Sequence, residues 1–322
     1  MLIHRLQSLA VAISCMACGA AFAASSDYPN RPVKFMVGFA AGGTTEVLAR
    51  LVSVKLTDKW KQAVIIDIRP GADGSIATGM VSRSAPDGLT IGWVTSAHSI
   101  TPVTTKLNYD PVAGIAPIIL ATSNPSLLVT HPGFPAKTVK ELIAYAKANP
   151  NKVTYASAGT STIQNLQMLQ FMSMANVKAL HVPYKGGGDA LTALLKGEVD
   201  LYFAGVSTAA SQVSAGKLRA LGVGSRSRSS FDPTMPTIAE AGDLPGFDAS
   251  NWTGALTAPG TPAEIINKVN VDTAEVLRAA DMQKRLEDLG FVVIASTPKE
   301  FGDTIKGDIA RWSSLLKDTP IQ

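Results

Sequence analysis

The sequence predicts an α/β protein of two lobes, each an open sheet flanked by helices, with a hinge and a central cleft between them. From residue 33 onward, short apolar strand patterns alternate with segments of helical periodicity. The 322 residues are many for one core and suit two α/β domains, and a content of 46% hydrophobic and 17% charged residues is that of a folded globular protein. Two connections, at 117–135 and 233–252, separate the alternating blocks, as expected if the chain crosses between two lobes twice.

We expect the chain to begin with a secretory signal peptide, residues 1–23. A basic start precedes an almost wholly apolar run, and Ala21-Phe-Ala23 is a small-x-small cleavage signal. The run is short for a membrane span, although a retained membrane anchor is the alternative. Both cysteines, Cys15 and Cys18, lie in this segment, so the mature chain has no disulfide and no thiolate ligand. Acylation of either cysteine, as in a lipoprotein, is a minor alternative.

Lobe 1 is predicted to comprise residues 24–124 and 250–322. It begins with a strand at 33–39 and a helix at 44–60, in which Val47, Leu48 and Leu51 recur near the 3.6-residue period. Its other elements, in chain order, are a strand at 63–68, a short helix at 75–84, strands at 90–95 and 118–120 and, after the segment 252–257, helices at 262–279, 280–289 and 298–316.

Lobe 2 is predicted to comprise residues 125–249. Its strands are 126–130, 153–157, 178–182, 199–204 and 218–223, and its helices are 138–148, 162–175 and 188–196. A capping Thr138, with Glu141 three residues on, begins the first helix, and Asn149-Pro150 ends it. Open α/β sheets bind ligands outside the carboxyl ends of their strands, so the loops after these strands are candidate sites.

The loop after the first strand, Gly38-Phe-Ala-Ala-Gly-Gly-Thr-Thr45, is the most informative segment of the chain. Its small residues let a ligand approach the backbone, and the helix start behind it offers unpaired N–H groups and partial positive charge. The loop has no Cys, His, Ser or Lys, so it is suited to hold a carboxylate and not to react with one. The predicted ligand-binding residues here are Phe39, Ala40, Ala41, Gly42, Gly43 and Thr44.

A second loop of the same kind lies in lobe 2, between the strand at 153–157 and the helix at 162–175. Its hydroxyl groups add donors to the backbone N–H groups, and its predicted binding residues are Ser157, Ala158, Gly159, Thr160, Ser161 and Thr162. One such loop is weak evidence, because turns between strands and helices are often Gly-rich for steric reasons. Two of them in different lobes predict a clamp, in which each helix start holds one carboxylate of a ligand that bears two.

Two further segments contribute candidates. In His181-Val-Pro-Tyr-Lys-Gly-Gly-Gly-Asp189 we predict that Tyr184 and Lys185 contact the ligand, whereas a tight turn that caps the next helix is the alternative. Ser96 and His98 lie at a predicted strand end. His98 is a candidate donor to a ligand, although a lone histidine is more often structural.

Other function classes find little support in the sequence. The net charge of +4 comes from scattered basic residues, not from the stripe or tail of a nucleic-acid-binding protein. The chain has no dinucleotide fingerprint, no Gly-Lys-Ser/Thr phosphate loop and no Gly-x-Ser-x-Gly elbow. The three histidines after the signal segment, at 98, 131 and 181, lack metal-binding spacing. We therefore expect no enzyme activity, metal, cofactor or nucleic acid, although a serine or threonine nucleophile assembled from distant segments stays open.

With these segments in view, the chain closely resembles the substrate-binding proteins of tripartite tricarboxylate transporters, the Bordetella uptake gene family. The resemblance rests on Tyr28-Pro-Asn-Arg-Pro-Val33, Gly38-Phe-Ala-Ala-Gly-Gly43, Arg69-Pro-Gly-Ala72, Ala85-Pro-Asp-Gly-Leu-Thr90, Tyr155-Ala-Ser-Ala-Gly159, His181-Val-Pro-Tyr-Lys-Gly186, Gly216-Lys-Leu-Arg-Ala220, Pro236-Thr-Ile-Ala-Glu-Ala-Gly242 and Ala258-Pro-Gly-Thr-Pro262. It implies a two-lobed periplasmic binding protein of type II that closes on an organic acid and delivers it to the membrane components of a transporter. It also implies that the loops at 39–44 and 158–162 hold carboxylates, partly through ordered waters, and we expect a monomer.

The chain departs from the pattern of this family at four places. The family usually has Asp at the position of Glu46, His at that of Asn165, Asp at that of Ala204 or Gly205, and Asn at that of Ile68. We add Asn165 and Ala204 to the predicted binding residues, because the resemblance places them in or beside the cleft. Less polar groups there favour a dicarboxylate with an apolar or aromatic body, such as terephthalate. A secreted hydrolase of a carboxylated substrate, and a ligand-sensing module for a membrane signalling receptor, stay open as alternatives.

Overall fold

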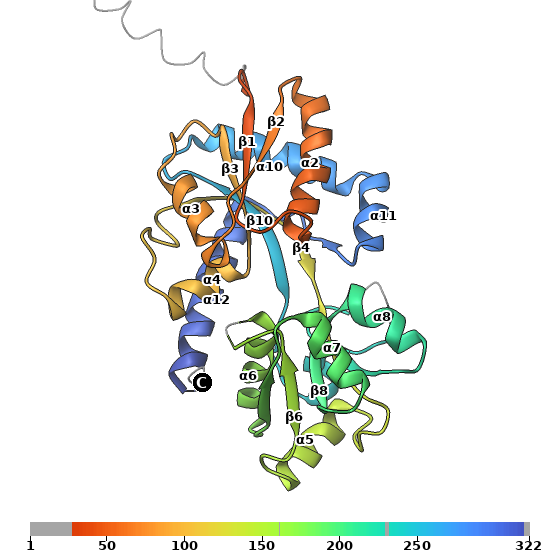
Figure 1. The fold of residues 1–322 in the computed structure, drawn as a ribbon. Helices are drawn as coiled ribbons and strands as arrows, with labels where there is room; N and C mark the ends of the chain where they lie inside the picture. Colours follow the sequence, from red (N-terminus) through yellow and green to blue (C-terminus); the bar gives the residue numbers. More distant parts are fainter. Residues whose placement is uncertain (1–27, 161, 229–231, 319–322) are drawn as a thin grey trace, which may run out of the picture.

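Two lobes, each with its own sheet, make up the structure (Figure 1). The computed structural model describes residues 28–160, 162–228 and 232–318. The predicted signal peptide and Ser161 lie outside the described residues. Within these ranges, no helix combines the length and the apolar character that a membrane span requires.

Lobe 1 contains a six-stranded mixed sheet in the order β11-β4-β10-β3-β1-β2. The strands are β1 (Val33–Val37), β2 (Val64–Ile68), β3 (Thr90–Thr95), β4 (Ala116–Asn124), β10 (Asn251–Thr257) and β11 (Val292–Val293). The helices that flank the sheet are α2 (Thr44–Trp60), α3 (Ser75–Ser82), α4 (Ala97–Thr104), α10 (Ala263–Arg278), α11 (Ala280–Asp288) and α12 (Pro298–Asp318). Strand β1 pairs in parallel with β2 and β3, and β10 pairs antiparallel with β3 and β4.

Both faces of this sheet are covered, which explains why β1 and β3 read as nearly continuous apolar runs. Phe35 and Trp93 belong to a core cluster with residues of α2 and α10, and their rings lie 5.5 Å apart. The alternate residues Met36 and Val94 point to the other face and pack with residues of α3 and α12.

Lobe 2 contains a five-stranded sheet in the order β7-β6-β8-β5-β9. The strands are β5 (Ser126–Thr130), β6 (Thr154–Ser157), β7 (Leu180–Pro183), β8 (Leu201–Gly205) and β9 (Arg219–Val223). The helices are α5 (Val139–Ala148), α6 (Ile163–Ala175), α7 (Gly187–Leu195), α8 (Val206–Ser214) and α9 (Ile238–Gly242). As predicted, Thr138 caps α5, because its hydroxyl accepts a hydrogen bond from the Glu141 N–H at 3.2 Å.

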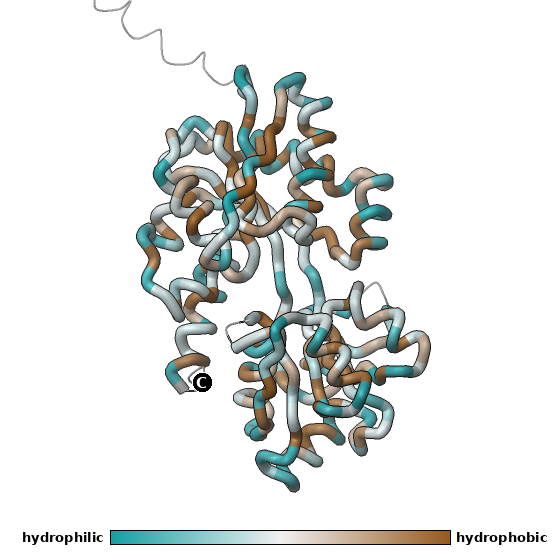
Figure 2. Tube along the Cα trace, in the orientation of Figure 1, coloured by the Kyte–Doolittle hydropathy of each residue, from teal (hydrophilic) through white to brown (hydrophobic). Residues whose placement is uncertain are grey.

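The chain crosses between the sheets at two adjacent places. Pro125 separates β4 from β5, and the return path enters β10 at Asn251, which pairs with Asn124. Figure 2 shows brown, hydrophobic residues collected within each lobe, whereas the crossing segments are pale or hydrophilic. The two lobes therefore have separate cores joined by a narrow two-stranded connection.

The terminal helix α12 makes another contact between the lobes. Trp312 and Leu315 of α12, with Ile100 of α4, form a buried cluster with Leu166 and Leu169 of α6 in lobe 2. In Figure 1 the lower end of α12 accordingly lies beside lobe 2.

The predicted α/β class is confirmed, with several differences in the elements. The segment from Ser96 to His98 is the start of α4 and not only a strand end, and α8, α9 and β11 were not predicted. Helix α8 is rich in serine, threonine and valine, which have low helix propensity. Strand β11 is only two residues long, and it is a strand only because it pairs with β4.

Candidate functional site

Strand register places the predicted ligand loops of lobe 1 at the edge that faces lobe 2. Because β1, β2 and β3 are parallel, their carboxyl ends lie at one edge of the sheet. Thr95, at the end of β3, pairs with Thr253, two residues after β10 begins at the crossing. The loops after β1, β2 and β3 therefore lie beside the connection to lobe 2.

The same logic holds for lobe 2. Strands β6, β7 and β8 are parallel, so the loops that follow them share one edge. Gly205, at the end of β8, pairs with Ser126, the first residue of β5 after the crossing. The carboxyl edges of both parallel groups thus face the hinge and each other, and the predicted clamp loops come from these two edges.

In lobe 1 the loop before α2 is open to solvent. Ala40, Ala41, Gly42 and Thr44 are exposed, and Phe39 is half-buried. Gly42 has φ +80°, a conformation that favours glycine.

Gly43 is the N-cap of α2, and no side chain caps this helix. The N–H groups of the first turn of α2 therefore lack intrahelical acceptors and are directed toward the loop.

Glu46, one of the departures from the family pattern, occupies part of this loop. Its Oε2 accepts a hydrogen bond from the Gly42 N–H at 3.3 Å, and its Oε1 accepts one from Arg50 Nε at 2.6 Å. The residue is only 5% exposed. A carboxylate in the first helical turn is favoured by the helix dipole, and here it competes with any ligand anion for the same positive end.

In lobe 2 the loop before α6 is held mainly by its own hydrogen bonds. The buried Ser157 hydroxyl donates to the Gly159 carbonyl at 2.8 Å and accepts from the Gly159 N–H at 3.1 Å. Thr162 Oγ1 donates to the same carbonyl at 2.7 Å, and it does not cap α6. Thr160 is exposed and Ala158 is half-buried, so these two residues and the first turn of α6 form the accessible part of the loop.

Asn165 lies behind this loop and not on its surface. It is 2% exposed, donates from Nδ2 to the Thr160 carbonyl at 2.7 Å, and accepts from the Tyr155 hydroxyl at 2.7 Å. Both ends of the amide are bonded to the protein in this structure, so a direct contact between Asn165 and a ligand stays a prediction. Asn165 acts in this structure by fixing the position of Thr160.

Three other predicted residues are also buried. Ala204 is 1% exposed within β8. Ser96 is 3% exposed, and its hydroxyl donates to Asn251 Oδ1 at 2.6 Å. His98 is 4% exposed, and its Nε2 lies 2.9 Å from the Pro111 carbonyl. These side chains are therefore buried in this structure. His98 also lines a small hollow with Phe39, and its Nδ1 has no hydrogen-bond partner there, so its role as a donor to a ligand stays a prediction.

The third predicted loop stays accessible. Lys185 is exposed and Tyr184 is half-buried, and Gly186 after them is the N-cap of α7. No side chain caps α7 or α8 at this edge. In contrast, α5, which follows the far end of β5, is capped by Thr138. The helices that begin at the interlobe edge thus keep their first-turn donors available for an anion.

Ser157 and His181 lie close together, as the serine and histidine of a catalytic dyad do. His181 Nε2 lies 2.6 Å from Ser157 Oγ, and the His181 ring stacks on Tyr155 with 4.9 Å between centroids. However, the Gly159 carbonyl can only accept, so the serine proton is directed there and His181 Nε2–H is the donor to Oγ. This histidine is therefore not placed to take the serine proton, as a general base would.

Metal chemistry has no evident location in the part of the chain that the structure describes. No group of three or more His, Cys, Asp or Glu residues there is arranged to hold a metal ion.

The chain is similar to known transport receptors. A family model described as "Tripartite tricarboxylate transporter family receptor" (TctC) matches residues 48–321. A UPF0065 protein from the tcbD-tcbE intergenic region of Pseudomonas sp. (strain P51) is 32% identical over 291 residues, which cover 90% of this chain and 86% of that protein.

Solved structures agree with this match. R. palustris Rpa4515, solved with adipate, has a TM-score of 0.73 at 31% identity and covers 90% of this chain and 98% of its own. MatC from Rhodopseudomonas palustris, solved with bound malate, has a TM-score of 0.69 at 31% identity and covers 90% of this chain and all of its own. The predicted two-lobed binding-protein fold and the predicted family are confirmed.

Burial lowers the pKa of both His98 and His181 below the ordinary value. The unfolded chain therefore binds more protons than the folded chain between the lowered pKa values and about 6.5. We expect the free energy of unfolding to be unaffected by these groups above pH 6.5 and to fall as the pH drops below it.

Urea unfolding at a series of pH values between about 8 and 5 would measure this dependence. His98→Gln, which keeps a donor for the Pro111 carbonyl but cannot take up a proton, should flatten the acid limb. An acid limb of unchanged steepness in this variant would assign the proton uptake to other groups.

Proposed function

Because the chain belongs to the tripartite tricarboxylate transporter family of receptors, we propose that it captures a small organic dicarboxylate between its lobes and delivers it to the membrane components of a transporter. In this proposal the signal segment directs the chain to the periplasm, where it works as a monomer. It carries its ligand unchanged and is not an enzyme.

The observation that carries the proposal is the opposition of the two carboxyl edges. Helices α2 and α6 begin at these edges without side-chain caps, and the loops before them have no basic side chain. Each helix start supplies neutral N–H donors and partial positive charge, which suit one carboxylate each. A ligand with a carboxylate at either end would contact both lobes, and so favour a closed arrangement over an open one.

The accessible side chains suggest the character of the ligand body. Among the exposed or half-buried candidates, Phe39, Ala40 and Ala41 of lobe 1 and Ala158 and Tyr184 of lobe 2 are apolar or aromatic, and Lys185 is the one that carries a charge. Adipate and malate, found with two related structures, are dicarboxylates. We propose an elongated dicarboxylate with an apolar body, of which adipate is the flexible type and terephthalate the rigid aromatic type.

Asn165 and Ala204, from which a roomier cleft was expected, are both buried. Because neither side chain lies on the cleft surface, their difference from the family pattern does not by itself make the cavity roomier. The apolar character of the accessible loop residues supports the aromatic proposal instead. Glu46 adds a negative charge near one end, which disfavours a ligand that brings a third carboxylate to that loop.

Isothermal calorimetry with adipate, terephthalate, malate and citrate tests the ligand class. We expect the apolar dicarboxylates to bind more tightly than citrate, and the ligand to be recovered unchanged after prolonged incubation. Tighter binding of citrate than of any aromatic diacid would reject the apolar body. Loss of ligand with accumulation of a product would favour the hydrolase alternative.

Gly43→Leu is expected to weaken binding at least about 10-fold. The leucine side chain would block a carboxylate from the backbone N–H groups, so the charge-assisted hydrogen bonds to them would be lost. A Cβ at this position would lie 3.1 Å from the Ala40 carbonyl, and the rest of the side chain would fill the start of α2. The smaller Gly43→Ala should weaken binding less. Calorimetry measures the affinities, and circular dichroism of the unliganded variants checks the fold. Unaltered affinity in a folded Gly43→Leu protein would reject this loop as the site.

Glu46→Gln should strengthen the binding of a dicarboxylate roughly 3- to 10-fold, because it removes a negative charge beside the loop and leaves Arg50 positive. The amide oxygen still accepts from the Gly42 N–H, so the loop keeps its shape. Asp58→Asn, an exposed change near the other end of the same helix, is the matched control. If Glu46→Gln binds no better than this control, the carboxylate of Glu46 does not oppose the ligand.

A further inference from the structure

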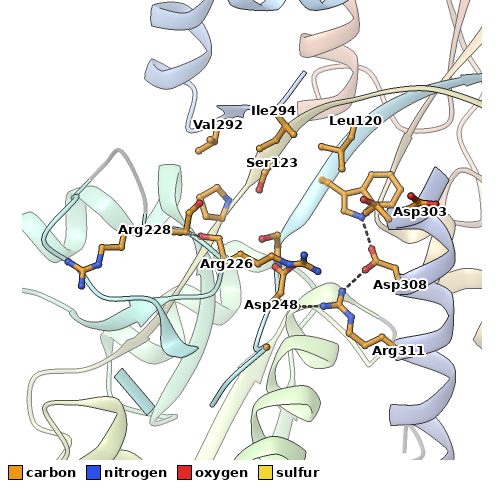
Figure 3. Close-up of a pocket in the computed structure, with 18 residues that line it drawn as sticks. Leu120, Ser123, Arg226, Arg228, Asp248, Val292, Ile294, Asp303, Asp308 and Arg311 are labelled. Atoms are coloured by element: carbon orange, nitrogen blue, oxygen red, sulfur yellow. Dashed lines mark hydrogen bonds and ion pairs between the residues drawn. The ribbon is translucent and has the colours of Figure 1, made fainter. Parts of the chain in front are cut away.

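A hollow of about 540 Å³ lies beside the hinge and is lined by both lobes (Figure 3). Leu120, Ser123 and Ile294 line it from lobe 1, and Arg226 and Asp248 from lobe 2. None of the residues predicted to bind the ligand lines this hollow. It is therefore a separate feature of the interface between the lobes.

Strand order places the hollow and the ligand loops on opposite sides of the crossing strands. In lobe 1 the ligand loops follow β3, β1 and β2, on one side of β10 and β4, whereas the hollow is lined by β4 and the segment around β11 at the other side. In lobe 2 the ligand loops follow β8, β6 and β7, whereas the hollow is lined by residues that follow β9 at the opposite edge. When the lobes rotate at the crossing strands so that the ligand loops approach each other, the surfaces that line the hollow must move apart.

A chain of polar contacts joins the lobes at this hollow, and Figure 3 shows its central part. Trp252 Nε1 donates to Asp308 Oδ2 at 2.8 Å, and Arg311 Nη2 donates to Asp308 Oδ1 at 2.8 Å. Arg311 Nη1 then donates across the interface to the backbone carbonyl of Asp248. The Asp248 carboxylate accepts from Arg226 Nε at 2.7 Å.

Both ends of the Arg311–Asp248 bond are anchored in rigid parts of the molecule. Asp248 lies between Phe247 and Ala249, which are buried in the core of lobe 2. Helix α12, which carries Arg311, packs into lobe 1 through the buried Phe301. A rotation of one lobe against the other therefore changes the distance between the Arg311 guanidinium and the Asp248 carbonyl.

The charges around the hollow favour a conformational role over capture of a second ligand. Arg226 is paired with Asp248, Arg228 with Glu240, and Arg311 with Asp308. Each of these cations already has its own carboxylate, so the hollow offers no unmatched charge to a small ion.

The second contact between the lobes, the apolar cluster around Trp312, is less sensitive to the angle between the lobes. The cluster of α4, α6 and α12 around Trp312 is apolar, and apolar contact is non-directional. A hydrogen bond weakens steeply with misalignment, so Arg311 responds to a small rotation to which this cluster is tolerant.

We propose that Arg311 is an interlobe latch that stabilises the arrangement seen here, with the ligand loops exposed and the hinge side closed. Closure on a ligand stretches the Arg311–Asp248 bond, so the latch opposes closure and lowers the affinity for the ligand. Because a ligand must draw the protein out of the latched state, the apparent dissociation constant exceeds that of the closed state. Arg311 is thus a positioning residue that sets affinity without contacting the ligand.

Small-angle X-ray scattering of the unliganded protein tests the latch without any assumption about the ligand. Arg311→Met keeps an unbranched apolar stem and removes the guanidinium donors, and it should lower the radius of gyration by shifting the lobes toward closure. Arg226→Met, at a residue whose side chain is 82% exposed, loosens the hold on Asp248 with little risk to folding and should shift the radius in the same direction by less. Arg285→Met, at an exposed position on α11 away from the hinge, is the matched control.

Calorimetry with adipate adds a functional measurement. We expect Arg311→Met to bind adipate about 3- to 10-fold more tightly than the Arg285→Met control, as the net loss of one ordinary hydrogen bond from the open state predicts. A radius of gyration equal to that of the control, or weaker binding of adipate, would overturn the latch. If adipate binds neither protein, the proposed ligand class is wrong, and the scattering result alone decides whether the latch exists.

Discussion

Parallel pairing of β1 with β2 and β3, and of β6 with β7 and β8, is the constraint on which the rest of the structure depends. Parallel strands end at the same edge, and the antiparallel crossing strands place that edge beside the hinge in both lobes. Helix starts from two separate sheets therefore face one cleft. Had either group been antiparallel throughout, its loops would have been divided between two edges and no clamp would form.

This opposition explains why the binding loops need so little special chemistry. An uncapped helix start already supplies N–H donors and partial positive charge, so small residues that leave the backbone accessible are sufficient. The polar side chains nearby act mainly on the protein itself: Asn165 and Ser157 fix the loop of lobe 2, and Glu46 satisfies one N–H of the loop of lobe 1.

The hinge connects this site to the opposite side of the molecule. Since the ligand loops and the hollow beside α12 lie on either side of the crossing strands, any change in one gap is accompanied by a change in the other. In the proposed latch, an arginine far from the cleft stabilises the open state and so lowers the affinity for the ligand.

The sequence by itself determined the alternation of strands and helices and the family, because these depend on local periodicity and on motifs in order. It also predicted the two clamp loops, which the structure places at the facing edges of the two sheets. It did not determine which candidate side chains reach the cleft. His98 and Asn165 had suitable chemistry, yet both are buried and bonded to the protein, since burial depends on how distant segments pack. The contact between Arg311 and Asp248 joins residues far apart in the chain and exists only because α12 lies beside lobe 2, so only the tertiary structure decided it.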